Sequence, residues 1–154
     1  MSLTDYQKLE NFLLTNMNEF HFGLLFCMHT GIRVGELSGL RWGGIDFAQR
    51  KIRIQRTVLR IKNLDHAVNP NTGKAPKTIL YIGPPKTEQS NREIPLPDKL
   101  LFHARRFQGK DSTYILSGTE KCMEPRIIQR RYAALLKTRE LTYSRICRML
   151  MHCL

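Results

Sequence analysis

Apolar residues near the amino terminus recur with the period of an α-helix. Leu9, Phe12 and Leu13 fall on one face, which predicts a helix over residues 3–16. Residues 20–28, FHFGLLFCM, are almost all apolar and predict a second helix that is mostly buried. The amino-terminal part of the chain is therefore expected to contain two core helices.

The next segment combines a break with a third helix. Gly31 can adopt the backbone angles that a sharp reversal demands, and Thr30 can cap a new helix. A helix is therefore expected from about residue 32 to residue 40, with its apolar side chains against the core.

From residue 51 the pattern changes to that of β-structure. In KIRIQRTVLRI, residues 51–61, isoleucines first alternate with basic residues, which is the period of a half-exposed strand. Residues 78–83 (TILYIG) and 92–97 (REIPLP) predict two further strands, the last one ended by proline. The polar residues 62–76 form a turn-rich insertion between strands. Together these segments predict a small antiparallel three-stranded sheet.

The last third of the pattern is again mainly helical. Residues 98–107 predict a helix, and Pro125 opens another that runs to about Lys137. Between them, residues 114–116 (YIL) are expected to be short and extended. The sequence contains no repeat and no internal domain boundary, so we expect one α+β domain over residues 1–154 that is mostly helical around the small sheet.

Composition indicates a globular domain with a polyanionic partner. The 154 residues are 42% hydrophobic, which is enough for one ordinary core. Lysine and arginine number 25 against 13 acidic residues, and the resulting charge of +12 favours nucleic acid, because neutralising phosphates releases counterions. On charge alone, a solvated cationic surface or a ribosome-associated protein is an equal alternative.

Signals for membranes and metals are absent from the sequence. The longest apolar run, residues 22–28, is far shorter than the roughly 20 residues that span a bilayer, and no signal peptide precedes it. We therefore expect a soluble, cytoplasmic protein. The four cysteines match neither a CxxC zinc site nor a secreted disulfide framework, so we expect reduced thiols, no metal and no other cofactor.

The stretch HTGIRVGELSGLRW, residues 29–42, places a charged pair between two apolar runs. Arg33 is expected in the first turn of the third helix, where backbone amides and the helix dipole already favour an anion. Glu36, one turn later, can pair with the guanidinium or orient it. The pair predicts a phosphate site, with an ordinary surface ion pair as the alternative.

The same stretch resembles the first conserved box of the tyrosine recombinase, or phage integrase, family. The similar residues are TGIRVGEL followed by LRWGGIDF. The resemblance implies that Arg33 contacts the scissile phosphate and that Glu36 supports the active site. It also implies that Trp42 and Asp46 help to position the turn that follows, and that the fold is the family's catalytic domain.

A second segment, PPKTEQSNREIPLP at residues 84–97, is similar to the family's KTxxSxRxIPL hairpin, which carries a catalytic lysine. The resemblance implies that Lys86 is that residue. Lysine presents a point charge near a phosphate and can offer its proton to a departing sugar oxygen. Considered alone, Lys86 is one of many lysines, but two boxes in the family's order favour the catalytic interpretation.

The predicted helix that Pro125 opens carries a third set of candidates. Its arginines Arg126, Arg130 and Arg131 can bind backbone phosphates, and a solvated helix face is an equal alternative. The resemblance implies double-stranded DNA as the partner, with homo-oligomers forming on it. The implied reaction is transesterification, in which a tyrosine oxygen attacks phosphorus and a phosphotyrosine intermediate forms without a metal.

The end of the chain is expected to carry a degenerate form of the family's second box, HxLRHT. In CRMLMHCL, residues 147–154, Arg148 stands at the first histidine, Met151 at the arginine and His152 at the second histidine. Chance or an altered reading frame explains this overlay equally well. Met151 cannot make the bidentate phosphate contact of an arginine.

No residue of the chain is assigned as the nucleophile. The family's tyrosine follows the second box, and we expect the chain to end before it. The resemblance covers residues 3 to about 140, and residues 141–154 form a tail whose only similarity is the overlay on the second box. The expected fold is thus a catalytic domain incomplete at its carboxyl terminus. The tyrosines present are Tyr6, Tyr81, Tyr114, Tyr132 and Tyr143.

These features support a first hypothesis of DNA integration or recombination by a mobile-element recombinase, of which this chain binds DNA but cuts none alone. The alternative is a noncatalytic DNA-binding remnant or regulator of a mobile element. A third class, RNA binding, is opposed by the absence from the sequence of an RNP-type aromatic pattern and a GXXG loop.

Overall fold

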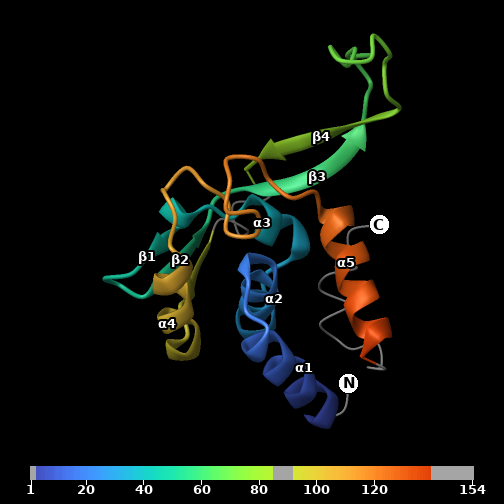
Figure 1. Ribbon diagram of the computed structural model, residues 1–154. Helices are drawn as coiled ribbons and strands as arrows, with labels where there is room; N and C mark the ends of the chain where they lie inside the picture. Colours follow the sequence, from blue (N-terminus) through green and yellow to red (C-terminus); the bar gives the residue numbers. More distant parts are fainter. Residues whose placement is uncertain (1–2, 85–91, 140–154) are drawn as a thin grey trace.

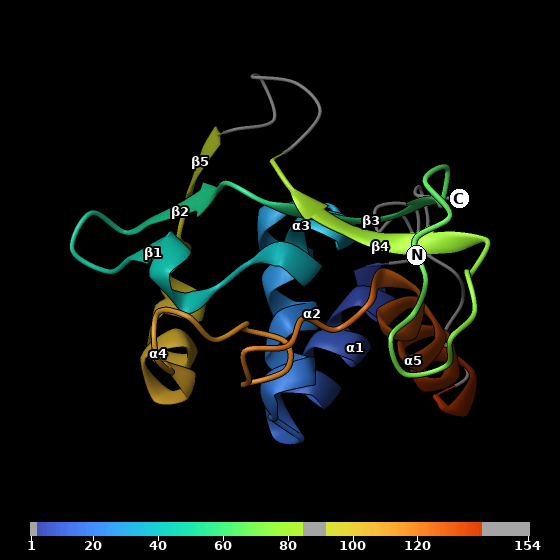
Figure 2. The same ribbon diagram turned by 90° about the horizontal axis from the view of Figure 1, so that it is seen from above.

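Five α-helices and two small antiparallel sheets make up the described part of this computed structural model, residues 3–84 and 92–139. Figures 1 and 2 show α2 in the middle, with α4 and α5 on opposite sides of it. No helix among the described residues is long and apolar enough to cross a membrane. The elements are α1 (Leu3–Thr15), α2 (Glu19–Thr30), α3 (Val34–Gly39), the 3-10 helix η1 (Trp42–Gly44), β1 (Ile45–Asp46), β2 (Lys51–Ile54), β3 (Thr57–Lys62), β4 (Thr78–Gly83), β5 (Arg92–Pro95), α4 (Asp98–Phe107) and α5 (Pro125–Thr138).

Helix α2 is the central core element, and its two ends are defined by local chemistry. Asn18 caps its start by accepting a hydrogen bond from the His21 backbone N–H over 2.9 Å. Gly31 ends it in the left-handed region, with φ of 69°, and donates its N–H to the Cys27 carbonyl. Phe20 and every residue from 22 to 27 are buried, so the prediction of a mostly buried second helix is confirmed.

Helix α3 begins later than the sequence predicted. It starts at Val34 rather than near residue 32, and Arg33 is its N-cap instead of part of its first turn. The reason is that the Glu36 carboxylate reaches back and accepts the Arg33 backbone N–H over 3.0 Å. The expected capping role of Thr30 is also wrong, because its hydroxyl donates to the Phe26 carbonyl over 2.6 Å and so belongs to the last turn of α2.

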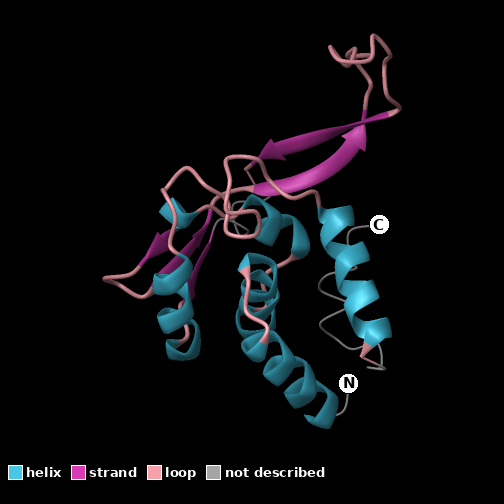
Figure 3. Cartoon of the chain, in the orientation of Figure 1, coloured by secondary structure: helices cyan, strands magenta, loops and turns pink. Residues whose placement is uncertain are grey.

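The strands form two sheets rather than the single sheet that the sequence predicted. A three-stranded antiparallel sheet has the order β1-β2-β5, and β3 and β4 form a separate hairpin (Figure 3). The predicted strand over residues 51–61 therefore divides after Ile54, because β2 pairs with β5 while β3 pairs with β4. The α+β class, mostly helical with a small three-stranded antiparallel sheet, is confirmed.

Two glycines allow α3 to pack directly on the backbone of β3 and of Arg56, the residue before it. A Cβ at Gly35 would lie 2.8 Å from both the Thr57 hydroxyl oxygen and the Val58 carbonyl oxygen. A Cβ at Gly39, one turn later, would lie 3.0 Å from the Arg56 carbonyl oxygen. Larger residues would hold α3 away from the strand, so these glycines set the depth at which α3 is buried.

The remaining elements close the core around α2. Helices α4 and α5 match the two predicted helices, α5 running one residue further than expected. Trp42 stacks on Phe22 with ring centroids 5.9 Å apart, and Phe107 stacks on the same ring at 5.7 Å. The expected extended segment at residues 114–116 is mostly turn; its first residue alone forms a β-bridge, with Arg41.

Replacing Gly31 by alanine should destabilise the domain by about 1 kcal/mol, because an L side chain is strained at φ of 69°. Asparagine tolerates the left-handed region better, so Gly31→Asn should lose roughly half as much. Urea unfolding followed by circular dichroism measures both. Equal losses in the two variants would contradict a backbone origin of the effect.

Candidate functional site

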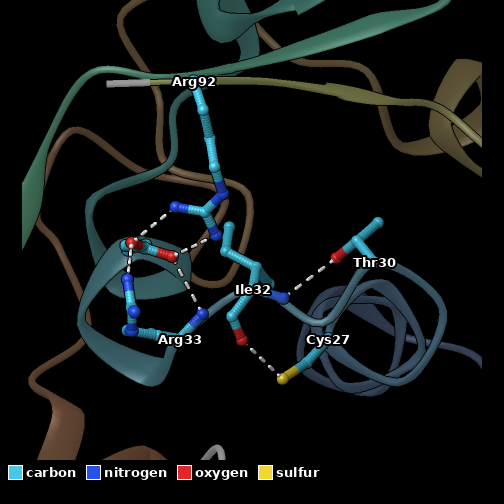
Figure 4. Close-up of polar contacts among 6 residues, drawn as sticks. Cys27, Thr30, Ile32, Arg33 and Arg92 are labelled. Carbon is cyan, nitrogen blue, oxygen red and sulfur yellow. Dashed lines mark hydrogen bonds and ion pairs between the residues drawn. The ribbon is translucent and has the colours of Figure 1, made fainter. Parts of the chain in front are cut away.

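The carboxylate of Glu36 lies at the centre of a cluster formed by α3 and β5. Only 3% of its side chain is exposed. Its Oε2 accepts from the Arg33 backbone N–H and from Arg92 Nη2, each over 3.0 Å. Its Oε1 accepts from Arg33 Nη1 over 3.1 Å and from Arg92 Nη1 over 2.9 Å. Figure 4 shows the Arg92 side chain extending from its strand toward the helix that begins after Arg33.

The two arginines of this cluster differ in their access to solvent. The Arg33 side chain is 62% exposed, whereas that of Arg92 is 32% exposed. Among the described residues, the Arg33 guanidinium is held through Nη1 on Glu36, which leaves its Nε and Nη2 donors for another partner. Arg33 is therefore the residue of the cluster that is placed to meet an anion from solution.

The charges of the cluster are fixed by its hydrogen bonds. Burial by itself raises the pKa of Glu36, but the hydrogen bonds from Arg92 and Arg33 outweigh burial and leave that pKa below its ordinary value. The bond to Glu36 likewise raises the pKa of Arg92. Two guanidinium groups thus share one ionised carboxylate, and the cluster keeps a net positive charge.

The segment that leads into Arg33 is held by buried neighbours. The Cys27 thiol donates to the Ile32 carbonyl over 3.1 Å, and the Ile32 N–H donates to the Thr30 hydroxyl over 3.4 Å. Burial, aided by the nearby Glu36 charge, raises the pKa of the Cys27 thiol to about 12. The thiol therefore stays protonated and serves as a donor rather than as a nucleophile.

The turn after α3 is fixed by Trp42 and Asp46. Trp42 is buried, and its backbone N–H donates to the Thr113 carbonyl over 3.0 Å. Asp46 accepts the Gln49 backbone N–H through Oδ1 and pairs with Arg53 through Oδ2, each over 2.9 Å. Trp42 is thus bonded to the loop that contains Thr113, and Asp46 to the turn after β1; the positioning role that the resemblance implied stays a prediction.

The predicted basic residues of α5 divide into two groups. Arg126 and Arg130 are exposed and lie one turn apart on the helix. Arg131 is also exposed, but its guanidinium carbon lies 4.1 Å from the centroid of the Phe20 ring, so part of its role is packing against α2. At the start of the helix, Glu124 and Arg60 form a bidentate pair at 2.7 and 2.8 Å that joins α5 to β3.

Several predicted site residues lie outside the described part of the chain. These are the catalytic lysine candidate and the degenerate second box, namely Lys86, Arg148, Met151 and His152. The described residues on either side of the lysine segment both adjoin α3. Gly83 pairs with Thr57, whose hydroxyl contacts the Gly35 position, and Arg92 bonds Glu36.

Arg92 is the member of the cluster that the sequence analysis missed. Arg92 stands at the arginine of the KTxxSxRxIPL pattern, but that pattern was used only to assign Lys86 and gave Arg92 no role. The informative signal is the burial of Glu36, since a nearly buried carboxylate needs more than one exposed partner. That burial is visible only once α3 and β5 are placed together.

Known proteins are related to the chain in sequence and in fold. No protein-family profile matches it. It is 39% identical over 77 residues to a tyrosine recombinase XerC-like protein of Caldanaerobacter subterraneus subsp. tengcongensis. These 77 residues make up 50% of this chain and 18% of the relative.

The fold is that of solved integrase structures. The Tn1549 transposon integrase in complex with transposon right end DNA is 18% identical, with a TM-score of 0.66 over 97% of this chain and 50% of the integrase chain. The same integrase with circular intermediate DNA gives a TM-score of 0.64 at 18% identity, over 97% of this chain and 51% of that chain. This chain thus spans about half of the integrase chains and a smaller part of the curated relative.

The chain is thus similar in sequence to a tyrosine recombinase and similar in fold to solved integrase structures. The resemblance to tyrosine recombinases is confirmed by the XerC-like relative, and the expected fold is confirmed by the integrase structures.

Replacing Glu36 by glutamine should cost about 2 kcal/mol of stability at pH 7, because charge-assisted hydrogen bonds are lost at a buried position. The folded-state pKa of Glu36 is lowered, so its stabilisation is present above the unfolded value of about 4.3 and is lost as the pH falls through the folded value. Urea unfolding from pH 7 to pH 3 should show the two proteins converging in acid.

Glu93→Gln provides the control for this pH series. Glu93 also has a lowered pKa, from its hydrogen bond with Lys51, but its side chain is 47% exposed. Glu93→Gln should therefore unfold with nearly the same free energy as the original chain at every pH, unlike Glu36→Gln. A difference of constant size between Glu36→Gln and the original chain across the pH range would contradict an ionised Glu36 as its source.

Proposed function

We propose that this chain is part of the catalytic domain of a site-specific tyrosine recombinase that acts on double-stranded DNA. The observation that carries the proposal is the Glu36 cluster, in which an exposed arginine is oriented by a buried carboxylate. The partial domain comprises residues 1–154, with the family resemblance over 3–140 and a tail at 141–154. The corresponding full-length protein would be a phage or transposon integrase of a mobile element that acts in the cytoplasm.

The proposed chemistry is transesterification at a DNA phosphodiester. Arg33 binds the scissile phosphate through the donors that Glu36 leaves available, and it stabilises charge that develops on the phosphoryl oxygens. Lys86 gives its proton to the departing sugar oxygen as a tyrosine oxygen attacks phosphorus. The nucleophile is not assigned to this chain, which we propose binds DNA without cutting it.

The wider DNA contact is proposed to involve α5. Arg126 and Arg130 are exposed and contribute to a chain with a formal charge of +12. Such residues contact backbone phosphates without reading sequence, and they set the register of the protein on the duplex. Arg131 contributes less to this contact, because its guanidinium packs over the Phe20 ring. Assembly into homo-oligomers on DNA is part of the proposal.

A second candidate function is a noncatalytic DNA-binding remnant or regulator of a mobile element. The observation that favours it is methionine at residue 151, where the overlay of the second box expects an arginine. A protein of this kind would bind the same duplex through Arg33 while lacking the second phosphate contact. The two candidates share DNA binding and differ in whether a longer protein supplies the missing catalytic groups.

Replacing Arg33 by alanine should weaken duplex DNA binding and lower its dependence on salt. Loss of one phosphate contact reduces the slope of log Kobs against log salt by about 0.9. Binding is measured by fluorescence anisotropy of a labelled duplex over a salt series. Arg105→Ala is the matched control, because Arg105 is an exposed arginine on α4, across α2 from α5.

Equal effects of the Arg33 and Arg105 substitutions would contradict a specific phosphate site. Tighter binding of single-stranded RNA than of duplex DNA at the same salt would favour the RNA-binding class instead. A covalent DNA adduct of the 154-residue chain on a denaturing gel would contradict the proposal that it cuts no DNA alone.

A further inference from the structure

Arg92 is the one member of the Glu36 cluster to which the proposed function gives no task. We propose that Arg92 is a positioning residue: by fixing the Glu36 carboxylate, it sets the direction in which Arg33 presents its guanidinium to a DNA phosphate. The inference deepens the proposed function and depends on it for the identity of the phosphate. It concerns a residue that touches no reacting atom.

The hydrogen-bond pattern fixes the carboxylate in one orientation. Each oxygen of Glu36 accepts one bond from Arg92 and one from Arg33. The planar fork of Arg92 matches both oxygens at 2.9 and 3.0 Å, so the carboxylate cannot turn about its last bond without breaking the fork. One oxygen is thereby aimed at the Arg33 backbone N–H and the other at Nη1.

The Arg33–Glu36 pair would not hold this geometry by itself. Arg33 is 62% exposed and lies three residues from Glu36, and an exposed ion pair of this local kind contributes little net stability. Arg92 comes from a different element, 56 residues further along the chain, and its side chain is half as exposed. The fork therefore ties the start of α3 to the edge of the three-stranded sheet.

Direct phosphate binding by Arg92 is disfavoured by the same contacts. Arg92 directs both terminal nitrogens at Glu36, and its side chain is only 32% exposed, so its remaining donors are less accessible to a phosphate than those of Arg33. Arg33 has donors available and twice the exposure. The geometry thus favours Arg33 as the residue that binds the phosphate and Arg92 as the residue that orients Glu36.

The chemistry of the fork requires arginine specifically. Lysine at residue 92 would keep the positive charge but offers a point charge in place of two parallel donors. Glutamine would remove the charge and leave the carboxylate with Arg33 alone. The expected order of function is therefore Arg92, then Arg92→Lys, then Arg92→Gln, a partial rescue that a purely steric role would not produce.

The first test reads the Arg33 backbone N–H, which donates to Glu36 Oε2 over 3.0 Å. Hydrogen exchange measured by NMR on the 154-residue chain should show a loss of protection at this amide of roughly tenfold or more in Arg92→Gln, and a smaller loss in Arg92→Lys. The Gly31 amide, bonded to Cys27, and the Leu37 amide, bonded to Arg33, serve as internal controls and should stay protected.

Arg60→Gln is the matched control for losing a bidentate arginine. Arg60 forms a fork on Glu124 at 2.7 and 2.8 Å, and its side chain has the same 32% exposure as that of Arg92. This variant should leave the Arg33 amide unchanged. Unchanged protection of that amide in Arg92→Gln would overturn the proposal, as would equal loss at all three amides in both Arg92 variants.

The second test asks whether Arg92 acts through Arg33 on DNA. Salt-dependent duplex binding is compared for Arg33→Ala, Arg92→Gln and the double variant. If Arg92 only positions Arg33, the double variant should bind like Arg33→Ala, with the slope about 0.9 lower than in the original chain. A further drop of similar size in the double variant would mean that Arg92 meets a phosphate itself, and would overturn the proposal.

The two tests separate this inference from the proposed function. If the original chain fails to bind duplex DNA, the proposed function fails, while the exchange of the Arg33 amide still decides whether Arg92 orients Glu36. If DNA binding depends on Arg33 but the amide is insensitive to residue 92, the proposed function stands and the positioning role of Arg92 is wrong.

Discussion

The rest of the site depends on the burial of one negative charge. A carboxylate that is 3% exposed is tolerated only when its oxygens are paired and hydrogen-bonded, and Glu36 meets this condition through Arg33 and Arg92. The requirement has three structural consequences. It makes Arg33 the N-cap of α3, it joins α3 to β5, and it leaves the exposed guanidinium with donors that no group among the described residues uses.

The fold supplies the conditions under which that burial is possible. Gly35 and Gly39 let α3 approach the β3 backbone, and the left-handed Gly31 turns the chain from α2 into Arg33. The protonated Cys27 thiol donates a hydrogen bond to the Ile32 carbonyl. None of these residues is placed to touch DNA in the proposed function, yet each determines where the charged cluster lies. Small and buried residues thus set the geometry of the cluster without belonging to it.

Local signals located the helices, apart from the start of α3, and were insufficient for the contacts between elements. The apolar period predicted α4 with its observed bounds, and glycine chemistry predicted the break at Gly31. The division of residues 51–61 into two strands has no glycine or proline to mark it and follows from the different partners of β2 and β3. Arg92 was missed for a related reason, since its partner lies 56 residues away. The Lys86 assignment stays a prediction from the motif.

The central claim is that Glu36 organises a phosphate site, and duplex DNA binding by Glu36→Gln tests it most directly. This substitution makes the chain one charge more positive, so a model based on charge alone expects tighter binding. Our account expects weaker binding at constant salt, because Arg33 loses its orientation. Glu124→Gln, which removes a carboxylate paired with Arg60, should bind as tightly as the original chain or more tightly. If Glu36→Gln binds as tightly as Glu124→Gln while remaining folded by circular dichroism, the account is contradicted.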